Sequence, residues 1–356
     1  MRQAILEKAG RFRLDEAPRP SPGPGELLLK IRAVGICGSD LHLFREGRIG
    51  DVPIELAGSR SEGKFIPGHE CMGVVEEVGA GVDAALAGCR VAVDPMAACG
   101  HCELCLAGNQ NLCPNMVFLG HPPVGGCLRE HLVLRADQVV PLPDELDDDA
   151  AVVLEPLSVA LHALRIGKVG PARSAAVLGS GPVGLSCIML LARMGVSPLI
   201  ATDVLDYRLA LAGELGATHA LNPARTDIAS EVKALTGGRG ADYVLECAGA
   251  PQTAGQTAEV AAIGGRVLVL GIPASDQDTL AFRHSAARRK GLTVFMIRRA
   301  NRTTRDGIAW ALKDRLPLGR LVTHHWPLAK VQEAFETAAG YADGVVKAIV
   351  NPQAGA

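Results

Sequence analysis

Features that would mark a membrane-spanning, secreted or nucleic-acid-binding protein are missing from this sequence. No apolar run approaches the roughly 18 residues of a membrane-spanning helix, and the longest candidate, 185–194, contains Arg193. The first residues, MRQAILE, include no apolar signal segment. A formal net charge of −2 gives no excess of positive charge for binding nucleic acid or an acidic membrane. We therefore expect a cytoplasmic protein that acts on a small molecule, without nucleic acid or membrane as a partner.

Internal repeats and low-complexity tracts are also absent. The 356 residues are expected to form about two domains, and 48% hydrophobic with 21% charged residues is ordinary for a globular protein. In a cytoplasmic protein, the ten cysteines are expected to be thiols or metal ligands more than disulfides.

A glycine-rich segment, residues 179–184, gives the clearest functional signal. It reads Gly-Ser-Gly-Pro-Val-Gly, follows the apolar run 175–178 and precedes the helical pattern 185–194. Strand, G-x-G-x-x-G and helix in this order are typical of a dinucleotide-binding turn, in which the pyrophosphate lies at the helix N-terminus. Asp203 follows 19 residues after the last glycine, at the end of a second apolar run. An acid at this distance is expected to bind a ribose 2′-hydroxyl.

Elements around this segment alternate between strand and helix, which predicts a doubly wound α/β sheet. The expected strands are 175–178, 199–202, 220–221, 243–246 and 266–270, and the expected helices are 185–194, 207–215, 228–235 and 252–263. Residues 1 to about 150 are instead β-rich, with short strands at 26–34, 73–78, 89–93 and 128–134. A helical pattern from 147 to 151 or beyond follows, and 156–166 is expected to be another helix. The tail predicts helices 304–313 and 331–339 and a strand 345–350 that rejoins the first domain.

Four cysteines stand close together as Cys99-x2-Cys102-x2-Cys105-x7-Cys113. Four thiolates at this spacing can surround one Zn²⁺ tetrahedrally and close it to water, which is typical of a structural site. An iron–sulfur cluster is the alternative, suggested by Pro114 after the last cysteine, but the final spacing differs from the ferredoxin pattern. Unligated thiols are a third interpretation.

A second possible metal group is scattered along the sequence. Cys37, His69, Glu70 and Glu155 are residue types that hold a catalytic zinc with an open position for water or substrate. From spacing alone, other interpretations remain open: a buried thiol, a core histidine and a solvated glutamate.

The whole chain resembles the zinc-dependent medium-chain dehydrogenase/reductase family and, within it, the sorbitol (polyol) dehydrogenase branch. The matching segments occur in family order over nearly the full length. They are 35–42 (GICGSDLH), 47–50 (GRIG), 67–70 (PGHE), the four cysteines, 155–162 (EPLSVALH), the glycine-rich segment with Asp203 and Arg208, and 321–324 (LVTH).

The resemblance implies an α/β protein of two parts. A GroES-like, β-rich, zinc-binding catalytic domain would comprise 1–155 and 298–356, and a Rossmann NAD-binding domain would comprise 156–297. The family commonly forms homodimers or homotetramers through the edge of the nucleotide-domain sheet, expected here near 266–272.

The resemblance also implies residue roles. Cys37 and His69 would ligate the catalytic zinc. Of Glu70 and Glu155, one would be a further zinc ligand and the other would hold the zinc-bound water. Ser39 and His42 would relay the proton of the alcohol. Cys99, Cys102, Cys105 and Cys113 would hold the structural zinc, giving two Zn²⁺ per chain. The implied NAD-binding residues are Gly179, Gly181, Pro182, Val183, Gly184, Asp203, Arg208, Gly271 and Ile272, and the implied substrate residues are Ser39, Phe118, Glu155 and Arg298.

The implied reaction is hydride transfer from a secondary alcohol of a polyol, cyclitol or sugar derivative to NAD, and the reverse. The carboxylate of Asp203 accepts both ribose hydroxyls but repels a 2′-phosphate, whereas Arg208 beside it is the one argument for NADP. A threonine-type amino-alcohol dehydrogenase and a non-enzymatic nucleotide-binding protein on the same fold are the alternatives.

The sequence departs from the polyol branch in two places. Leu43 stands where the branch has an aromatic residue in the substrate pocket, so sorbitol itself becomes doubtful. Residues 55–64 look like an insertion, interpreted either as a surface loop or as a lip over the substrate cleft. An arginine at 298 is compatible with a row of hydroxyls or with a carboxylate, so a sugar acid stays open as a substrate.

Overall fold

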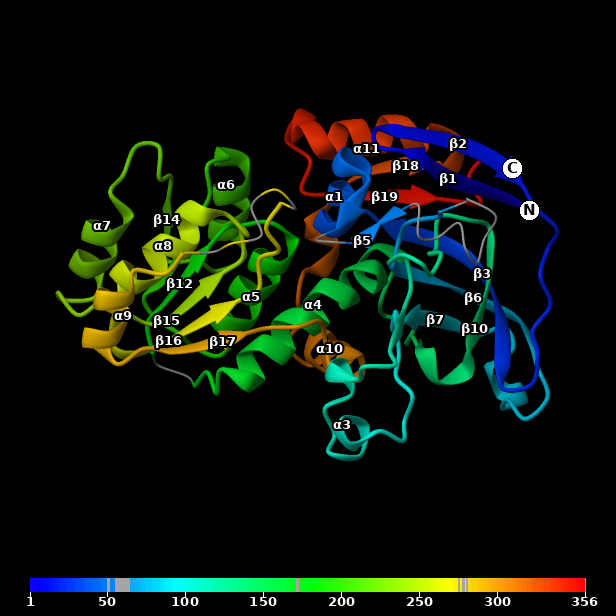
Figure 1. Ribbon diagram of the computed structural model, residues 1–356, viewed down its shortest axis with the longest axis horizontal. Coiled ribbons are helices and arrows are strands. Elements are labelled where there is room, and N and C mark those ends of the chain that lie inside the picture. The colour runs from blue at the N-terminus through cyan, green and yellow to red at the C-terminus, as the bar shows by residue number, and fades with distance from the viewer. Residues whose placement is uncertain are drawn as a thin grey trace. The chain divides into compact units, whose positions relative to one another are not determined.

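The computed structural model describes residues 1–49, 52–54, 65–170, 173–274, 276, 279 and 281–355. The chain divides into two compact units, Met1–Glu155 with Thr304–Ala356, and Pro156–Thr303 (Figure 1). The first unit is thus built from both ends of the sequence, and the second from one continuous segment. The predicted insertion at 55–64 lies outside the described residues. None of the helices within the described ranges has the length and apolar character needed to cross a membrane.

The described part of the first unit is organised around a seven-stranded sheet with the order β11-β7-β6-β3-β19-β18, in which β10 also pairs with β3. The strands are β3 (Glu26–Gly35), β6 (Glu70–Val78), β7 (Arg90–Val93), β10 (His131–Arg135), β11 (Val139–Pro141), β18 (Val322–Pro327) and β19 (Lys347–Asn351). Strand β19 lies antiparallel to β3 and parallel to β18. The C-terminal strands therefore extend a sheet that the N-terminal strands begin.

Short ribbons and helices complete the described part of this unit. The ribbons pair β1 (Arg2–Lys8) with β2 (Arg11–Glu16), β4 (Arg48–Ile49) with β5 (Val52–Pro53), and β8 (Met96–Ala97) with β9 (Val117–Phe118). The helices are α1 (Gly38–Glu46), α3 (Glu103–Leu106), α10 (Thr304–Lys313) and α11 (Val331–Gly340).

Three phenylalanines anchor α1 in this unit. The ring of Phe44 on α1 lies 5.4 Å from that of Phe335 on α11 and 5.7 Å from that of Phe12 on β2, measured between centroids. Phe335 is fully buried and Phe44 is 5% exposed. Buried aromatic pairs at such distances contribute attraction beyond the area that they bury, so the helix that follows Cys37 is held firmly against the core.

Helix α4 (Asp148–Ile166) is continuous, which corrects the expectation of two separate helices divided near Pro156. Proline removes one backbone hydrogen bond from a helix and usually kinks or ends it. Here the residues on either side of it, including Leu154 and Leu157, are buried, and Val152 packs against Ala33 of β3 and Ile349 of β19. Tertiary packing therefore outweighs the local preference of proline.

The described part of the second unit has a six-stranded sheet, all parallel, with the order β14-β13-β12-β15-β16-β17 (Figure 1). Its strands are β12 (Ala175–Leu178), β13 (Leu199–Thr202), β14 (His219–Leu221), β15 (Ala241–Glu246), β16 (Ala261–Val269) and β17 (Thr293–Met296), and its helices are α5 (Pro182–Arg193), α6 (Asp206–Glu214), α7 (Ile228–Leu235), α8 (Pro251–Val260) and α9 (His284–Lys290). This order confirms the doubly wound sheet. It turns back at β12, and ligands of such sheets bind where the order reverses, beyond the carboxyl ends of the strands.

Candidate functional site

Three metal-ligating side chains meet beyond the end of β3. The donor atoms of Cys37, His69 and Glu70 all lie within 4.8 Å of one another. Cys37 directly precedes α1, and Glu70 is the first residue of β6. The register of the sheet pairs Glu70 with Gly35, which is close to Cys37 in sequence. Strand pairing thus brings together donors from two separate motifs.

Gly35 permits this close approach because it has no side chain. A Cβ atom at position 35 would lie 2.5 Å from Glu70 Oε2 and 2.7 Å from Val152 Cγ1. Both distances are far below van der Waals contact, so any side chain at position 35 would displace Glu70 or Val152.

Asp40 is a buried acid that contacts the backbone beside two of the donors. Its Oδ2 accepts a hydrogen bond from the N–H of Cys37 at 3.0 Å, and its Oδ1 accepts one from the N–H of Gly68 at 3.1 Å. Oδ1 also lies 3.5 Å from His69 Nδ1. A carboxylate behind a histidine orients the ring and strengthens the other nitrogen as a metal ligand. Asp40 was not predicted to have a role, although its place three residues after the N-cap Cys37 is the signal of a capping box.

The surroundings of His69 favour positive charge. Burial acts to lower the pKa of its imidazole, but the charges of Asp40 and Cys37 outweigh burial and hold that pKa well above its ordinary value. A metal cation would supply the positive charge that these neighbours favour, with the neutral imidazole ring as its ligand. Thiolate, imidazole and carboxylate are also the donors that Zn²⁺ takes in proteins. The residues present therefore fit a zinc ion.

Lys347, the first residue of β19, is a functional candidate that the sequence analysis missed. Its Nζ donates hydrogen bonds to Glu70 Oε2 at 2.5 Å and to the Ile36 carbonyl at 3.1 Å. Burial acts to lower the pKa of this amine, but the charges of Glu70, Cys37 and Glu155 and the hydrogen bond to Glu70 together outweigh burial and raise the pKa above its ordinary value. A lysine inside the apolar run VVKAIV was the signal that could have found it, because buried lysines are rare unless paired.

Glu155 lies on α4, and its carboxyl interacts electrostatically with His69, Glu70 and Lys347. Burial raises the pKa of its carboxyl to about 7, with His69 opposing the shift and Glu70 adding to it. Its oxygens do not belong to the set of donors that lie within 4.8 Å of one another. Of the four predicted ligands, three therefore form a close set, and the carboxyl of Glu155 lies outside that set.

The other predicted residues of this unit surround the same motifs. Ser39 and His42 both lie on α1, and His42 Nδ1 is 3.1 Å from Glu46 Oε1, one helical turn further on. Phe118 on β9 has its ring centroid 5.5 Å from that of His69. Leu43, which aligns with a pocket aromatic of the polyol branch, is 1% exposed and belongs to the hydrophobic core.

The four cysteines of the 99–113 segment form the second group. All four Sγ atoms lie within 4.8 Å of one another, and two of the pairs, Cys99 with Cys105 and Cys102 with Cys113, are 3.9 Å apart. Tetrahedral geometry with Zn–S bonds of about 2.3 Å requires sulfur atoms about 3.8 Å apart. The spacing thus fits one ion, and it is too small to enclose an iron–sulfur cluster. Backbone N–H groups of His101 and Cys102 lower the pKa of Cys99 to about 6, toward the thiolate that binds metal.

The glycine-rich segment of the second unit joins β12 to α5. Gly179 has φ +100°, and a Cβ atom there would lie 2.9 Å from the backbone nitrogen of Ala248. A Cβ atom at Gly184 would lie 2.0 Å from the Gly179 carbonyl oxygen. Gly181 is the N-cap of α5, and Pro182 and Val183 are its first residues. This bare turn before a helix N-terminus is a cradle that fits a pyrophosphate.

Asp203 follows β13 and is tied to the same turn. Its Oδ2 accepts a hydrogen bond from the N–H of Ser180 at 2.9 Å, and its Oδ1 accepts one from Leu205 at 2.9 Å. Arg208 Nη1 lies 3.8 Å from Oδ2. A carboxylate thus lies beside the cradle with a guanidinium directly behind it.

The remaining predicted residues lie at the ends of two neighbouring strands. Gly271 and Ile272 follow β16, and Ile272 is 52% exposed. Arg298 follows β17 and belongs to the second unit.

Comparison with known proteins extends over the whole chain. Residues 23–144 match the model of the alcohol dehydrogenase GroES-like domain, and residues 182–313 match that of the zinc-binding dehydrogenase. The sorbitol dehydrogenase of Bacillus subtilis is 35% identical over 352 residues, which is 99% of this chain and 97% of that protein. The L-idonate 5-dehydrogenase of Vitis vinifera is 34% identical over 326 residues, covering 90% and 86% of the two chains.

A solved structure shows the same arrangement of elements. An alcohol dehydrogenase of Escherichia coli CFT073, complexed with NADH, superimposes with a TM-score of 0.88 at 28% identity and covers 99% of both chains. Since both family domains match in order and the relatives align nearly from end to end, the protein belongs to the zinc-dependent medium-chain dehydrogenases, as a member with the GroES-like and Rossmann-type domains of an alcohol dehydrogenase.

Proposed function

We propose that this protein oxidises a secondary alcohol of a polyol, cyclitol or sugar derivative to the ketone with NAD⁺, and catalyses the reverse reaction. The close set formed by Cys37, His69 and Glu70 carries this proposal. Relatives named sorbitol dehydrogenase and L-idonate 5-dehydrogenase support the polyol or sugar-acid class. Within the chain, we assign the catalytic role to Met1–Glu155 with Thr304–Ala356, and NAD binding to Pro156–Thr303, so the boundary follows the two compact units and lies six residues later than the expected one at 297.

Cys37, His69 and Glu70 would hold the catalytic zinc. Bound zinc would act as a Lewis acid that lowers the pKa of an alcohol, and NAD⁺ would accept the hydride. Because Lys347 binds Glu70 through Oε2, the other carboxylate oxygen is free to face a metal. We therefore assign Glu70 as the third protein ligand and Glu155 as the acid that holds the water or hydroxyl in the open position.

Other residues of the first unit would orient the reactants and carry the proton. Asp40 keeps the His69 ring in place through the contacts described above. Ser39 and His42 share α1 and are residue types that pass a proton between a reacting hydroxyl and solvent. Phe118 lies against His69 and offers an apolar wall for the substrate. From the second unit, Arg298 would contact hydroxyls or a carboxylate of the substrate.

The second unit would bind NAD. Gly179, Gly181, Pro182, Val183 and Gly184 would cradle the pyrophosphate, and Gly271 and Ile272 would contact the nicotinamide half. Asp203 would accept the ribose hydroxyls, while its negative charge would repel a 2′-phosphate. Arg208 already faces Asp203, which reduces what it offers to NADP.

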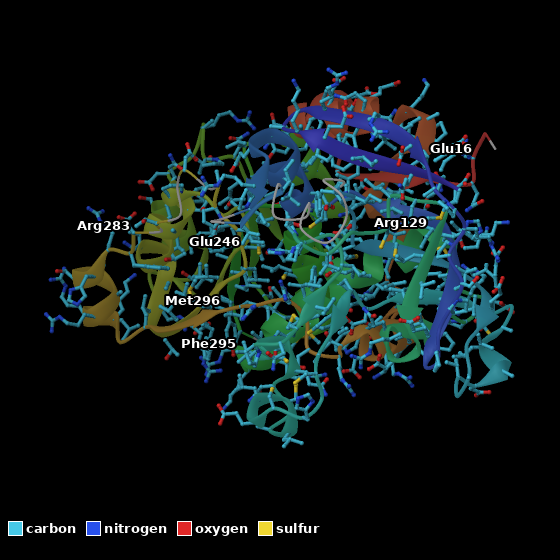
Figure 2. The ribbon with its side chains drawn as sticks, turned by 45° about the vertical axis from the view of Figure 1, so that its right-hand side comes forward. Glu16, Arg129, Glu246, Arg283, Phe295 and Met296 are labelled. Carbon is cyan, nitrogen blue, oxygen red and sulfur yellow. The ribbon has the colours of Figure 1, made fainter. Side chains whose placement is uncertain are left out.

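Two further assignments complete the proposal. Cys99, Cys102, Cys105 and Cys113 would hold a structural zinc, giving two Zn²⁺ per chain. We also infer a homodimer, or a homotetramer built from dimers, through the edge of the nucleotide-domain sheet. The expected edge near 266–272 is wrong, because β16 is paired on both sides, and the last strand of the described sheet is β17. Val294 and Met296 on this strand are 41% and 69% exposed. Met296 is labelled in Figure 2, and an exposed apolar edge strand favours pairing with another chain.

The experiment that tests the proposal is a screen of NAD⁺ reduction by the zinc-loaded protein. The substrates are polyols, inositols, aldonates and L-threonine, each assayed with NAD⁺ and with NADP⁺. Turnover of at least one polyol, cyclitol or sugar acid is the expected result. Turnover of L-threonine alone would identify the substrate as an amino alcohol and not a polyol or sugar derivative. Absence of turnover with every substrate would overturn the proposal.

A further inference from the structure

Glu246, the last residue of β15, is a fully buried acid with an unusual set of contacts. In the parallel sheet it pairs with Leu178, which directly precedes the glycine-rich turn, and with Val269 at the end of β16. It therefore lies beside the point where the strand order reverses, in the second unit (Figure 2). Buried carboxylates are rare unless paired, so its position needs an explanation.

One oxygen of Glu246 organises the turn that follows β15. Oε1 accepts hydrogen bonds from the N–H groups of Ala248 and Gly249, at 3.0 and 2.8 Å, and from the hydroxyl of Thr253 at 2.7 Å. Thr253 lies in the first turn of α8. Through these three hydrogen bonds, Oε1 of Glu246 holds both the 247–249 turn and the first turn of α8 in place.

The other oxygen faces a different loop. Oε2 is buried and has no hydrogen-bond partner in the described part of the chain. A Cβ atom at Gly271 would lie 2.5 Å from this oxygen and 2.1 Å from the backbone nitrogen of Gly249. The Gly271 N–H also donates to the backbone carbonyl of Glu246 at 3.0 Å. An unsatisfied buried carboxylate oxygen is costly in free energy, and here it is kept where it limits how closely the loop after β16 can approach.

The glycine-rich turn also contacts the 247–249 turn. The backbone nitrogen of Ala248 lies 2.9 Å from the position that a Cβ of Gly179 would take. The 247–249 turn is therefore in close contact with Gly179, before α5, and with Gly271, after β16. These are the backbone segments to which dinucleotide binding is assigned above.

We propose that Glu246 is a positioning residue of the dinucleotide site, which sets the spacing between the loops after β12, β15 and β16. It acts through those loops and does not need to touch the cofactor. The inference rests on the proposed function, because it assumes that these loops bind NAD. Glu246→Gln keeps the acceptor at Oε1 but puts an NH₂ group where an oxygen faces Gly271 and where no acceptor is described, so the loops are expected to move apart.

The test compares NADH affinity, thermal stability and kinetics of the zinc-loaded protein. We expect Glu246→Gln to raise both the Kd for NADH, measured by fluorescence titration, and the KM for NAD⁺. Each should rise about tenfold, which corresponds to about 1.4 kcal/mol. The KM for the alcohol at saturating NAD⁺ and the melting temperature without cofactor should stay close to those of the wild type. Glu259→Gln on α8, which breaks a surface ion pair with Arg283, is the control and should leave NADH affinity unchanged.

A second variant covers the case in which Glu246→Gln does not fold. Thr253→Val removes one of the three donors to Oε1 and should raise the Kd for NADH about threefold, a smaller shift in the same direction. A Kd within twofold of the wild type in Glu246→Gln, or in Thr253→Val if only that variant folds, would overturn the inference while the proposed function stands. Failure of the wild type itself to bind NADH would overturn both.

Discussion

Lys347 Nζ lies 2.5 Å from Glu70 Oε2, and both side chains are only 1% exposed. Removing one partner of such a pair leaves an uncompensated buried charge, which costs about 3–5 kcal/mol. We expect Lys347→Met to lower the free energy of unfolding of the metal-free protein by about this amount, measured by urea denaturation in the presence of a chelator. The double variant Glu70→Gln/Lys347→Met should recover most of the loss, because neither charge remains.

Lys330→Met is the matched control for that measurement. Lys330 pairs with Glu333 at 3.3 Å, but the two side chains are 59% and 56% exposed, and exposed pairs contribute about 0–1 kcal/mol. Equal losses in the two lysine variants would contradict the view that Glu70 depends on Lys347.

Metal content tests the four-cysteine group independently of activity. The wild type should contain two zinc ions per chain by elemental analysis, and Cys105→Ser should contain one, because a tetrahedral structural site needs all four ligands. Cys89→Ser should retain both ions, since Cys89 belongs to neither donor group. A single zinc in the wild type that survives Cys105→Ser would rule out the two-site arrangement.

His69→Ala separates the metal-dependent step from dinucleotide binding. Loss of the catalytic ion removes several kcal/mol of charge stabilisation, so we expect kcat to fall by about a thousandfold or more. The Kd for NADH should change less than twofold, because its proposed site is in the other unit. His284→Ala, an exposed histidine on α9, should behave like the wild type, and retained turnover in His69→Ala would exclude zinc catalysis at this group.

Cofactor preference depends on the acid after β13. Asp203→Ala removes the charge that repels a 2′-phosphate and releases Arg208, so the ratio of kcat/KM for NAD⁺ over NADP⁺ should fall by at least about tenfold, or about 1.4 kcal/mol. Asp206→Ala removes an acid three residues further on, where the carboxylate is 63% exposed and bound to Arg225, and should shift the ratio much less. An unchanged ratio in Asp203→Ala would show that the ribose is bound elsewhere.

The proposed dimer depends on the apolar edge of β17. Met296→Lys puts a charge on that edge, and lysine on an edge strand opposes pairing with another chain. We expect the variant to elute as a monomer in size-exclusion chromatography with light scattering. Leu106→Lys changes a side chain that is 76% exposed on α3 and should leave the assembly intact; the same mass for Met296→Lys and the wild type would place the interface elsewhere.

The Rossmann-type elements were predictable where burial leaves a clear pattern. Strands β12 and β13 are fully buried and match the predicted residues, and α7 begins and ends where its amphipathic pattern predicts. Strand β17 and helix α9 were not predicted. The residues of β17 are mostly exposed, and no residue of α9 is buried, so neither carries the periodic apolar signal on which such predictions depend.

The metal group shows a similar division. Cys37, His69 and Glu70 were predicted from family motifs, and the structure brings their donor atoms together. Asp40 and Lys347 received no role, because their function lies in contacts across the sheet rather than in spacing. Asp40 reaches Gly68, 28 residues away in sequence, and only the register of β3, β6 and β19 brings Lys347 to Glu70.

The pairing of Glu70 with Lys347 spans 277 residues, and this separation governs when the metal centre can be completed during synthesis. A ribosome makes Cys37, His69 and Glu70 early, then the whole of Pro156–Thr303, and only afterwards β19. Domains generally fold as units while the chain emerges, so the second unit can fold before the first has its buried lysine. During that interval Glu70 lacks its cation, and the nascent first unit lacks strands β18 and β19 of its sheet. Zinc that binds at this stage would supply the missing positive charge, so metal availability would influence how efficiently the newly made protein reaches its final fold.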